Sequence, residues 1–399
     1  MGVRTTEVEK ALYSKALLDS IHIGASSPFI PIYAVQLGAT PLQVSLIYAL
    51  SNFNLNLFQI FWGYISDRIG KKALFIIVGS ISSSILLIPI LLTSSPTILI
   101  ILVTLHSIAI SMTIPTFISY SAEVIEEQRI RIFSGRINSL MYIGWVTATL
   151  TIGITSEIGL NGFVAGLILA LISGLIGVII FSINCREVES DPPRVKRDYR
   201  QRSLLVEVKS HDHLIQFIIT SSSFSVFLSL SWPLFTITQT KIALLTFFEI
   251  SLLEVASGAS GAICLFLLLR WISKIGLQKL LIISSSSLAI IPLFYGLTPE
   301  FLSLLLIHLI SGIVSSIYDT SVFSYILEKT PMKEKGLCTA LYNFATGTAL
   351  FTGPILSGLL LEHLTSTFSL SEALLYLYLT STIGRFLTGL LYYYIKILD

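Results

Sequence analysis

Seven ionisable side chains stand inside long apolar runs of this 399-residue sequence, where few kinds of chemistry are open to them. An ionisable group in hydrocarbon costs at least about 2.5–3.5 kcal/mol at mid-span, so it faces a cavity or a partner. Proton binding, contact with a polar ligand, and pairing between helices are the three roles that fit. The seven residues are Asp19, His22, His106, Glu254, His308, Asp319 and Arg385.

Glu254 lies near the middle of its run and has no oppositely charged residue within one helical turn. It is the first candidate for a protonatable group, with an ion pair to Arg385 as the equal alternative. For Arg385 itself, packing against Glu254 or Asp319 is the expected role.

The first apolar run carries Asp19 and His22, three residues apart and so on one helical face. Lys15 stands four residues before Asp19 on that face, so an ion pair is as plausible as a coupling role for Asp19. For His106 and His308, a helix–helix hydrogen bond and a functional contact both remain open.

Long apolar helices must position these residues, because 53% of the sequence is hydrophobic, 12% is charged, and its mean hydropathy is +0.83. A helix needs about 20 apolar residues to cross a bilayer, so the chain predicts an all-α polytopic membrane protein of about twelve spans. No large soluble domain fits. The predicted spans lie near residues 12–35, 41–65, 73–94, 97–120, 133–155, 162–184, 214–239, 243–268, 279–298, 301–326, 338–361 and 373–396.

The Lys and Arg residues predict the orientation. One alternate set of connections holds nearly all of them, whereas the other set holds only Lys241. The positive-inside rule then places both termini in the cytoplasm, which requires an even number of spans. We expect a multi-pass protein of the cell membrane.

The chain divides into two similar halves. We predict one six-helix bundle over residues 1–184, a cytoplasmic linker over 185–212, and a second bundle over 213–399. A shift of 205 residues superimposes Pro28 on Pro233 and Asn138 on Asn343, among other identities. Two matched halves of six spans are typical of transporters built by duplication.

A charged loop between the second and third predicted spans carries a sharper signal. It runs Gly63-Tyr64-Ile65-Ser66-Asp67-Arg68-Ile69-Gly70-Lys71-Lys72. This resembles the signature loop of the major facilitator superfamily, G-x-x-x-D-(R/K)-x-G-(R/K)-(R/K), at every defined position. Here Gly63 is expected to permit close helix packing, Gly70 a tight turn, and the two lysines a cytoplasmic loop.

The resemblance implies a cytoplasmic gate. Asp67 would face the helix start near residues 336–339, where the helix dipole favours an anion by about 0.3–1 kcal/mol. Arg68 would pair with Glu123 at the end of the fourth span. These contacts would hold the cytoplasmic side closed.

The eleventh predicted span carries Gly347, Gly353, Pro354 and Gly358, a spacing that lets helices approach and bend where the halves meet. The family's Gly-Pro motif usually marks the fifth span of antiporters, so its place here argues against a drug–proton antiporter. By the same resemblance, spans one, four, seven and ten line the cavity. Asp19, His22, His106, His308 and Asp319 would then contact solute or protons.

Together these features predict a secondary transporter that moves a small solute by alternating access, with proton coupling as the first hypothesis. A facilitative uniporter and a multidrug-type exporter remain alternatives. A membrane enzyme is disfavoured because neither clustered acids or histidines at a membrane boundary nor a metal-type histidine spacing occurs. A receptor is disfavoured because it would normally carry a sizeable cytoplasmic domain. Without a nucleotide-binding loop, the energy would come from a gradient or from the solute itself. We expect no cofactor, metal or nucleic acid partner, and a monomer in the lipid bilayer. The sequence does not identify the solute.

Overall fold

The computed structural model describes residues 2–187, 212–272, 275–330 and 335–395, and within these ranges every regular element is helical. Eleven of the described helices are long and apolar enough to cross a membrane by length and composition. The remaining predicted span is formed by α1 (Gly2–Ser26) and α2 (Ile30–Gln36). The all-α polytopic prediction is confirmed.

Contacts divide the chain into two units, Met1–Ala39 with Leu50–Lys196, and Thr40–Ala49 with Arg197–Asp399. The start of α3 (Pro41–Ile69) thus groups with the second unit and its remainder with the first. The boundaries predicted at 184 and 213 stay a prediction, since most of the predicted linker lies outside the described residues.

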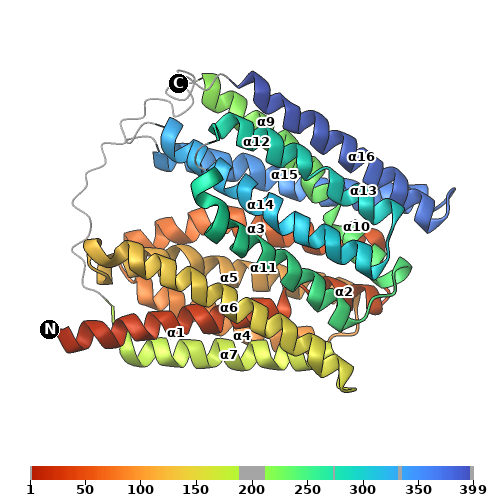
Figure 1. The fold of residues 1–399 in the computed structure, drawn as a ribbon. Helices are drawn as coiled ribbons and strands as arrows, with labels where there is room; N and C mark the ends of the chain where they lie inside the picture. The colour runs from red at the N-terminus through yellow and green to blue at the C-terminus, as the bar shows by residue number, and fades with distance from the viewer. Residues whose placement is uncertain (1, 188–211, 273–274, 331–334, 396–399) are drawn as a thin grey trace. The chain divides into compact units, whose positions relative to one another are not determined.

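In the first unit, α1 packs along α6 and α7, and α4 packs along α5 and α7, as Figure 1 shows. The buried faces mix apolar residues with small and hydroxyl ones, as in α4 with Ile76, Gly79 and Ser80. The helices of this unit that follow α3 are α4 (Lys72–Leu92), α5 (Pro96–Val124), α6 (Ile130–Glu157) and α7 (Gly162–Asn184).

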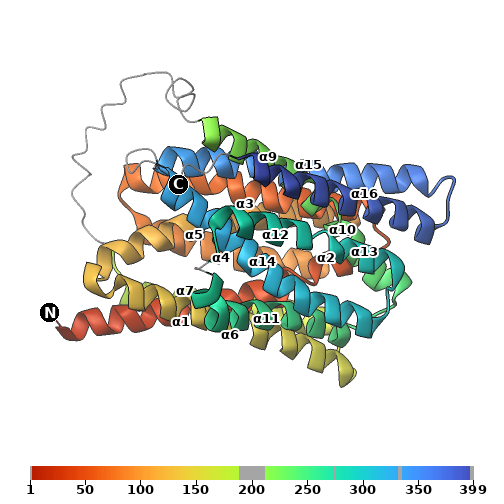
Figure 2. The ribbon, with the colours of Figure 1, turned by 45° about the horizontal axis from the view of Figure 1, so that its top comes forward.

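In the second unit, α9 packs against α15 and α16, and α11 packs against α14; the first group is easily followed in Figure 2. The helices of this unit are α9 (Asp212–Leu230), α10 (Trp232–Ile237), a π-helical turn (Thr238–Ile242), α11 (Phe247–Ile272), α12 (Leu277–Ser287), α13 (Ile290–Leu297), α14 (Phe301–Lys329), α15 (Lys335–Leu364) and α16 (Leu370–Leu390).

Two spans of the second unit are broken in the middle. Pro233 is the second residue of α10 and Pro292 the third residue of α13. A proline lacks the N–H that would bond the carbonyl four residues earlier, and its ring crowds that carbonyl. The spans therefore restart at these points as separate half-helices, α10 after α9 and α13 after α12.

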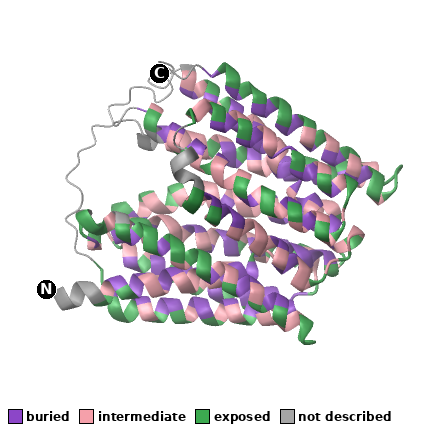
Figure 3. Cartoon of the chain, in the orientation of Figure 1, coloured by how far each residue is buried: buried purple, intermediate pink, exposed green. Residues whose placement is uncertain are grey.

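The outer surface of the helices is apolar. Large hydrophobic side chains are exposed along them, with Phe266 at 88% as the extreme. Figure 3 shows these exposed residues alternating with buried ones along single helices. Buried serine, threonine and tyrosine side chains fill much of the interior instead. Such a distribution suits a chain whose surroundings are hydrocarbon.

Candidate functional site

The signature loop begins at the end of α3 and turns into α4. Gly70 has a φ of 72°, in the left-handed region that glycine adopts without a side-chain clash, so its predicted turn is confirmed. The role expected for Gly63 is wrong. A Cβ built there would meet only Pro115 Cβ at 3.6 Å, an ordinary contact, so close helix packing does not require this glycine.

Lys72, the first residue of α4, is the centre of the loop's charges. Its ammonium pairs with Glu123 on α5 and lies 3.6 Å from the Asp67 carboxylate. Within the described chain, Arg68 forms no ion pair. The expected Arg68–Glu123 pair is therefore wrong, because Lys72 stands between the two acids and takes Glu123 for itself.

Two expectations for the signature loop stay predictions: its cytoplasmic placement by Lys71 and Lys72, and the contact of Asp67 with a second helix start. Lys71 is the N-cap residue of α4, and its side chain makes no capping hydrogen bond. The contact expected between Asp67 and the helix start near 336–339 joins the two units, so it stays a prediction. The side chains of residues 335–337 lie outside the described part.

Glu187, three residues after the end of α7, caps the start of α4. The sequence did not indicate this role. Its carboxylate accepts hydrogen bonds from the backbone N–H groups of Leu74 (2.7 Å) and Ala73 (3.2 Å). Tyr120 fixes the same segment by donating to the Arg186 carbonyl at 2.9 Å. The free N–H groups of a helix start favour such an anion.

The ion pair proposed on α1 is present. Lys15 is fully buried, and its ammonium pairs with Asp19 and donates to Ser80 Oγ of α4 at 2.9 Å. Of the two roles open for Asp19, the pairing role therefore has direct geometric support. Coupling by Asp19 stays a prediction.

His22 and His106 lie together inside the first unit, their Nε2 atoms 3.4 Å apart. His22 Nδ1 lies 2.9 Å from the Ala170 carbonyl of α7, which can only accept, so Nδ1 carries the proton and donates. Its Nε2 is then the acceptor for the N–H of His106. A helix–helix hydrogen bond, one of the two roles left open for His106, is therefore present, with a defined tautomer for each ring; a functional role for His106 stays a prediction.

A polar chain crosses the second unit through His308. Gln239 Nε2 donates to Tyr295 Oη, and Tyr295 Oη lies against His308 Nε2, both at 2.7 Å. The Gln239 amide nitrogen can only donate, which leaves the Tyr295 hydroxyl proton for His308. The three residues come from the π-helical turn, α13 and α14.

Glu254 lies on α11, within electrostatic range of the Tyr295 and Tyr48 hydroxyls. No described residue forms an ion pair with it. Tyr48, in the part of α3 that groups with this unit, bonds Thr236 Oγ1 at 2.7 Å. Asp319 lies on α14 with an exposed side chain, and it too has no ion pair within the described ranges.

The ion pair expected for Arg385 is wrong. Its guanidinium is 1% exposed and donates to the carbonyls of Leu288 and Leu228 at 2.8 Å and of Phe227 at 3.3 Å, as well as to Ser231 Oγ. Neither Glu254 nor Asp319 is among its partners in the described chain. Broken helices supply carbonyl acceptors, so the cation needs no carboxylate here.

The glycines predicted on the eleventh span lie on α15, where Pro354 stands inside the helix. A Cβ on Gly353 would meet Ser229 Oγ at 2.2 Å and the Val226 carbonyl at 2.4 Å, so this glycine allows α15 to pack closely on α9. A Cβ on Gly358 would meet Leu42 and Ser45 at 2.7 Å. Gly347 lies on the same helix, and a role at an interface between halves stays a prediction for all four residues.

Sequence reasoning missed Gln239, Tyr295 and Tyr48. A glutamine inside an apolar span was a usable signal, because a buried amide needs hydrogen-bond partners. Tyrosines gave none, since aromatic residues in spans usually serve packing.

Comparison with known proteins agrees with this architecture. The family model described as Major Facilitator Superfamily matches residues 16–242 and 213–395. An uncharacterised MFS-type transporter of Methanocaldococcus jannaschii is 22% identical over 351 residues, which cover 86% of this chain and 88% of that protein.

Solved structures of similar fold include the nucleoside transporter NupG, at a TM-score of 0.77, 14% identity and coverage of 98% of this chain and 100% of NupG. Another is a bacterial homologue of the human lysosomal transporter Spinster, inward-facing and unoccupied, at a TM-score of 0.73 and 14% identity, covering 98% and 97% of the two chains. A peptide-bound transporter of the POT family follows at 0.73 and 12%, covering 97% and 96%. The chain belongs to the major facilitator superfamily and is a membrane transporter of that type.

Proposed function

We propose that this protein is a proton-coupled secondary transporter of a small neutral or weakly amphiphilic solute, with Glu254 as the proton-binding carboxyl. It would work as a monomer of the cell membrane with both termini in the cytoplasm. The observation that carries the proposal is a carboxyl in the middle of a membrane helix that has no ion-pair partner among the described residues. A carboxyl with a fixed cation could not exchange its proton as readily.

The surroundings of Glu254 support the same conclusion. The hydroxyls of Tyr48 and Tyr295 lie within its electrostatic range, and Tyr295 continues into the chain of Gln239 and His308. These groups are neutral donors and acceptors, which can hydrogen-bond a carboxyl in either protonation state. Few free charges line this region, which disfavours a highly charged solute.

The first unit would supply the gate. Lys72, at the start of α4, links Asp67 near the end of α3 to Glu123 near the end of α5, so the signature loop carries a compact charge network. In alternating access, such a network changes contacts while the solute site stays central.

A thermal-shift screen of the purified protein would identify the solute. Nucleosides and short peptides belong in the screen because proteins of similar fold carry those names. Sugars, amino acids, organic acids and lipophilic cations complete it. A ligand that binds the folded but not the unfolded protein raises the unfolding temperature, and the rise grows with the ligand concentration.

The solute then permits the decisive variant. Glu254→Gln keeps the size of the side chain but cannot release a proton, so proton-driven uptake into proteoliposomes should be lost while solute exchange continues. Glu300→Gln, at an exposed N-cap position without a side-chain capping bond, is the matched control and should behave as wild type. Unchanged proton-driven uptake by Glu254→Gln would remove Glu254 from this role.

A further inference from the structure

We infer that Arg385 is a positioning residue that ties together two helix breaks and so sets the geometry of the polar chain around Glu254. The inference rests on the proposed function only in assigning that polar chain to transport. Its structural basis is the set of carbonyls that the guanidinium binds.

Those carbonyls lie at the breaks in the two spans, and one of them is left without its helical donor by a proline. Leu288 is four residues before Pro292, so its carbonyl lacks the N–H it would receive in a continuous helix. Arg385 Nη1 donates to this oxygen at 2.8 Å and replaces the missing donor. Phe227 and Leu228, in the last turn of α9, present their carbonyls to the other side of the guanidinium.

The charge of Arg385 is balanced without an acid. A helix C-terminus carries the equivalent of roughly −0.5 elementary charge, and the guanidinium lies at two of them, the ends of α9 and α12. Two such ends offset about one positive charge. A planar group with five donors can serve both ends at once, whereas an ammonium is a single point.

Two glycines let α16 come close enough for this contact. A Cβ on Gly384 would lie 2.1 Å from the Phe227 ring on α9, and one on Gly389 would lie 2.8 Å from Ser285 Oγ on α12. Ser381 adds a hydrogen bond to the Phe227 carbonyl at 2.7 Å. The sequence of α16 is thus fitted to hold Arg385 between the two breaks.

The half-helices beyond the breaks carry the polar chain. Gln239 lies in the π-helical turn that directly continues α10, and Tyr295 lies on α13. Their 2.7 Å hydrogen bond closes a path from Arg385 through both half-helices to His308. A change in the angle of either break would therefore move the Tyr295 hydroxyl, which lies within electrostatic range of Glu254.

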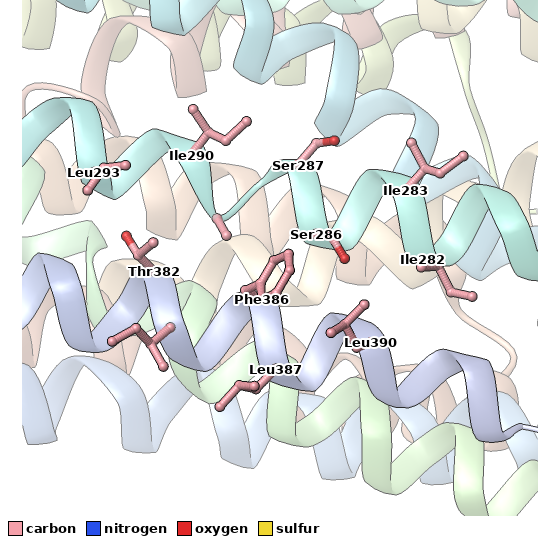
Figure 4. Close-up of a pocket in the computed structure, with 12 residues that line it drawn as sticks. Ile282, Ile283, Ser286, Ser287, Ile290, Leu293, Thr382, Phe386, Leu387 and Leu390 are labelled. Atoms are coloured by element: carbon pink, nitrogen blue, oxygen red, sulfur yellow. The ribbon is translucent and has the colours of Figure 1, made fainter.

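An apolar groove of about 650 Å³ lies between α12, α13 and α16, as Figure 4 shows. Ala289 at the break lines it, together with Thr382 and Phe386, which flank Arg385 on α16. Leu288 and Ala289 themselves are buried, so the guanidinium binds the break inside the helix packing.

Hydrogen exchange of the full-length protein in detergent tests the inference without a solute. In Arg385→Gln, amides of α10 and α13 should exchange about tenfold faster or more, while α14 and the first unit keep their wild-type rates. In Arg385→Lys, the ammonium can donate to the carbonyls of one break but not of both. Only one of α10 and α13 should then keep its wild-type exchange rate. Thr382→Val, one turn earlier on α16, is the control and should change neither. Wild-type exchange of α10 and α13 in Arg385→Gln would overturn the inference.

Should Arg385→Gln fail to fold, Ser231→Ala removes one acceptor of Arg385 and should speed amide exchange in α10 alone; no change in α10 would also overturn the inference.

A double-mutant cycle, measured on transport of the solute found by the screen, separates positioning from a general loss of stability. Arg385→Lys and Tyr295→Phe should affect transport non-additively, whereas Thr382→Val and Tyr295→Phe should add. Additivity in the first cycle would contradict action through Tyr295. These results are independent of Glu254→Gln, so either proposal can fail alone.

Discussion

The two units of this transporter satisfy their charges in different ways. Ion pairs join several described residues of the first unit, among them Lys15 with Asp19 and Lys72 with Glu123. In the second unit the buried cation binds carbonyl oxygens, and hydroxyl chains such as Ser221–Tyr392–Tyr318 take the place of charge pairs. The two halves match in span number and in marks such as Pro28 and Pro233, yet their interiors follow different chemistry.

This difference suggests a division of labour. A charge with a fixed partner, as in the pair of Lys15 and Asp19, holds one arrangement of its helices. A carboxyl among neutral hydrogen-bonding groups can change its protonation state at lower cost. On this view the first unit holds gate and scaffold charges, and the second unit holds the proton site.

The largest effect should come from breaking the buried ion pair of the first unit. Lys15→Met leaves Asp19 without its cation and should lower the free energy of unfolding by about 3 kcal/mol. Lys10→Met is the matched control, because Lys10 pairs with Glu7 at an exposed position of the same helix, and it should cost under about 0.5 kcal/mol. Thermal unfolding in detergent measures both. Equal losses would mean that the ion pairs of the first unit do not act as a scaffold.

A smaller effect should follow from crowding the contact between α11 and α14 in the second unit. A Cβ on Gly312 would lie 1.9 Å from the Ser257 carbonyl, so Gly312→Ala must push α14 from α11 and should cost about 2 kcal/mol. Gly63→Ala in the first unit meets only an ordinary contact and should be near neutral. The same unfolding assay decides, and a larger loss for Gly63→Ala would reverse the comparison.

The smallest effect concerns Cys185, just after α7. Burial raises the pKa of its thiol from 9.0 to about 11, and the neighbouring Tyr120 side chain opposes part of this rise. The folded protein therefore favours the neutral thiol of Cys185. This contribution to the free energy of unfolding is fully present below pH 9 and is lost as pH rises through about 11. Maleimide labelling of a variant with Cys264 and Cys338 replaced by serine should be slow at pH 7.5 and accelerate toward pH 11. Rapid labelling at pH 7.5 would show that Cys185 is not held as a buried thiol.

Much of the fold was predictable because membrane helices must be long, apolar and internally hydrogen-bonded. The predicted spans coincide with the helices, and the Gly63–Lys72 loop predicted the family correctly. Periodicity could not predict that the spans after Pro233 and Pro292 restart as separate half-helices, since a proline can also kink a continuous helix.

The candidate site was less predictable. Helical spacing was enough to suggest the Lys15–Asp19 pair, because both residues lie on one helix. The partners of Lys72 and Arg385 depend on which helix ends meet, and that is decided by packing at positions such as Gly384. Side-chain charge alone therefore suggested Arg68 as the ion-pair partner of Glu123 and an acid as the partner of Arg385. Both predictions were wrong.

The central claim is that solute movement through this protein is coupled to protons at Glu254. Proteoliposomes loaded with a pH-sensitive dye and given the solute from the screen test it most directly. Wild-type protein and Glu300→Gln should change the internal pH when the solute is added, whereas Glu254→Gln should move solute by exchange with no pH change. A pH change of wild-type size in Glu254→Gln, or none in the wild type, would contradict the claim.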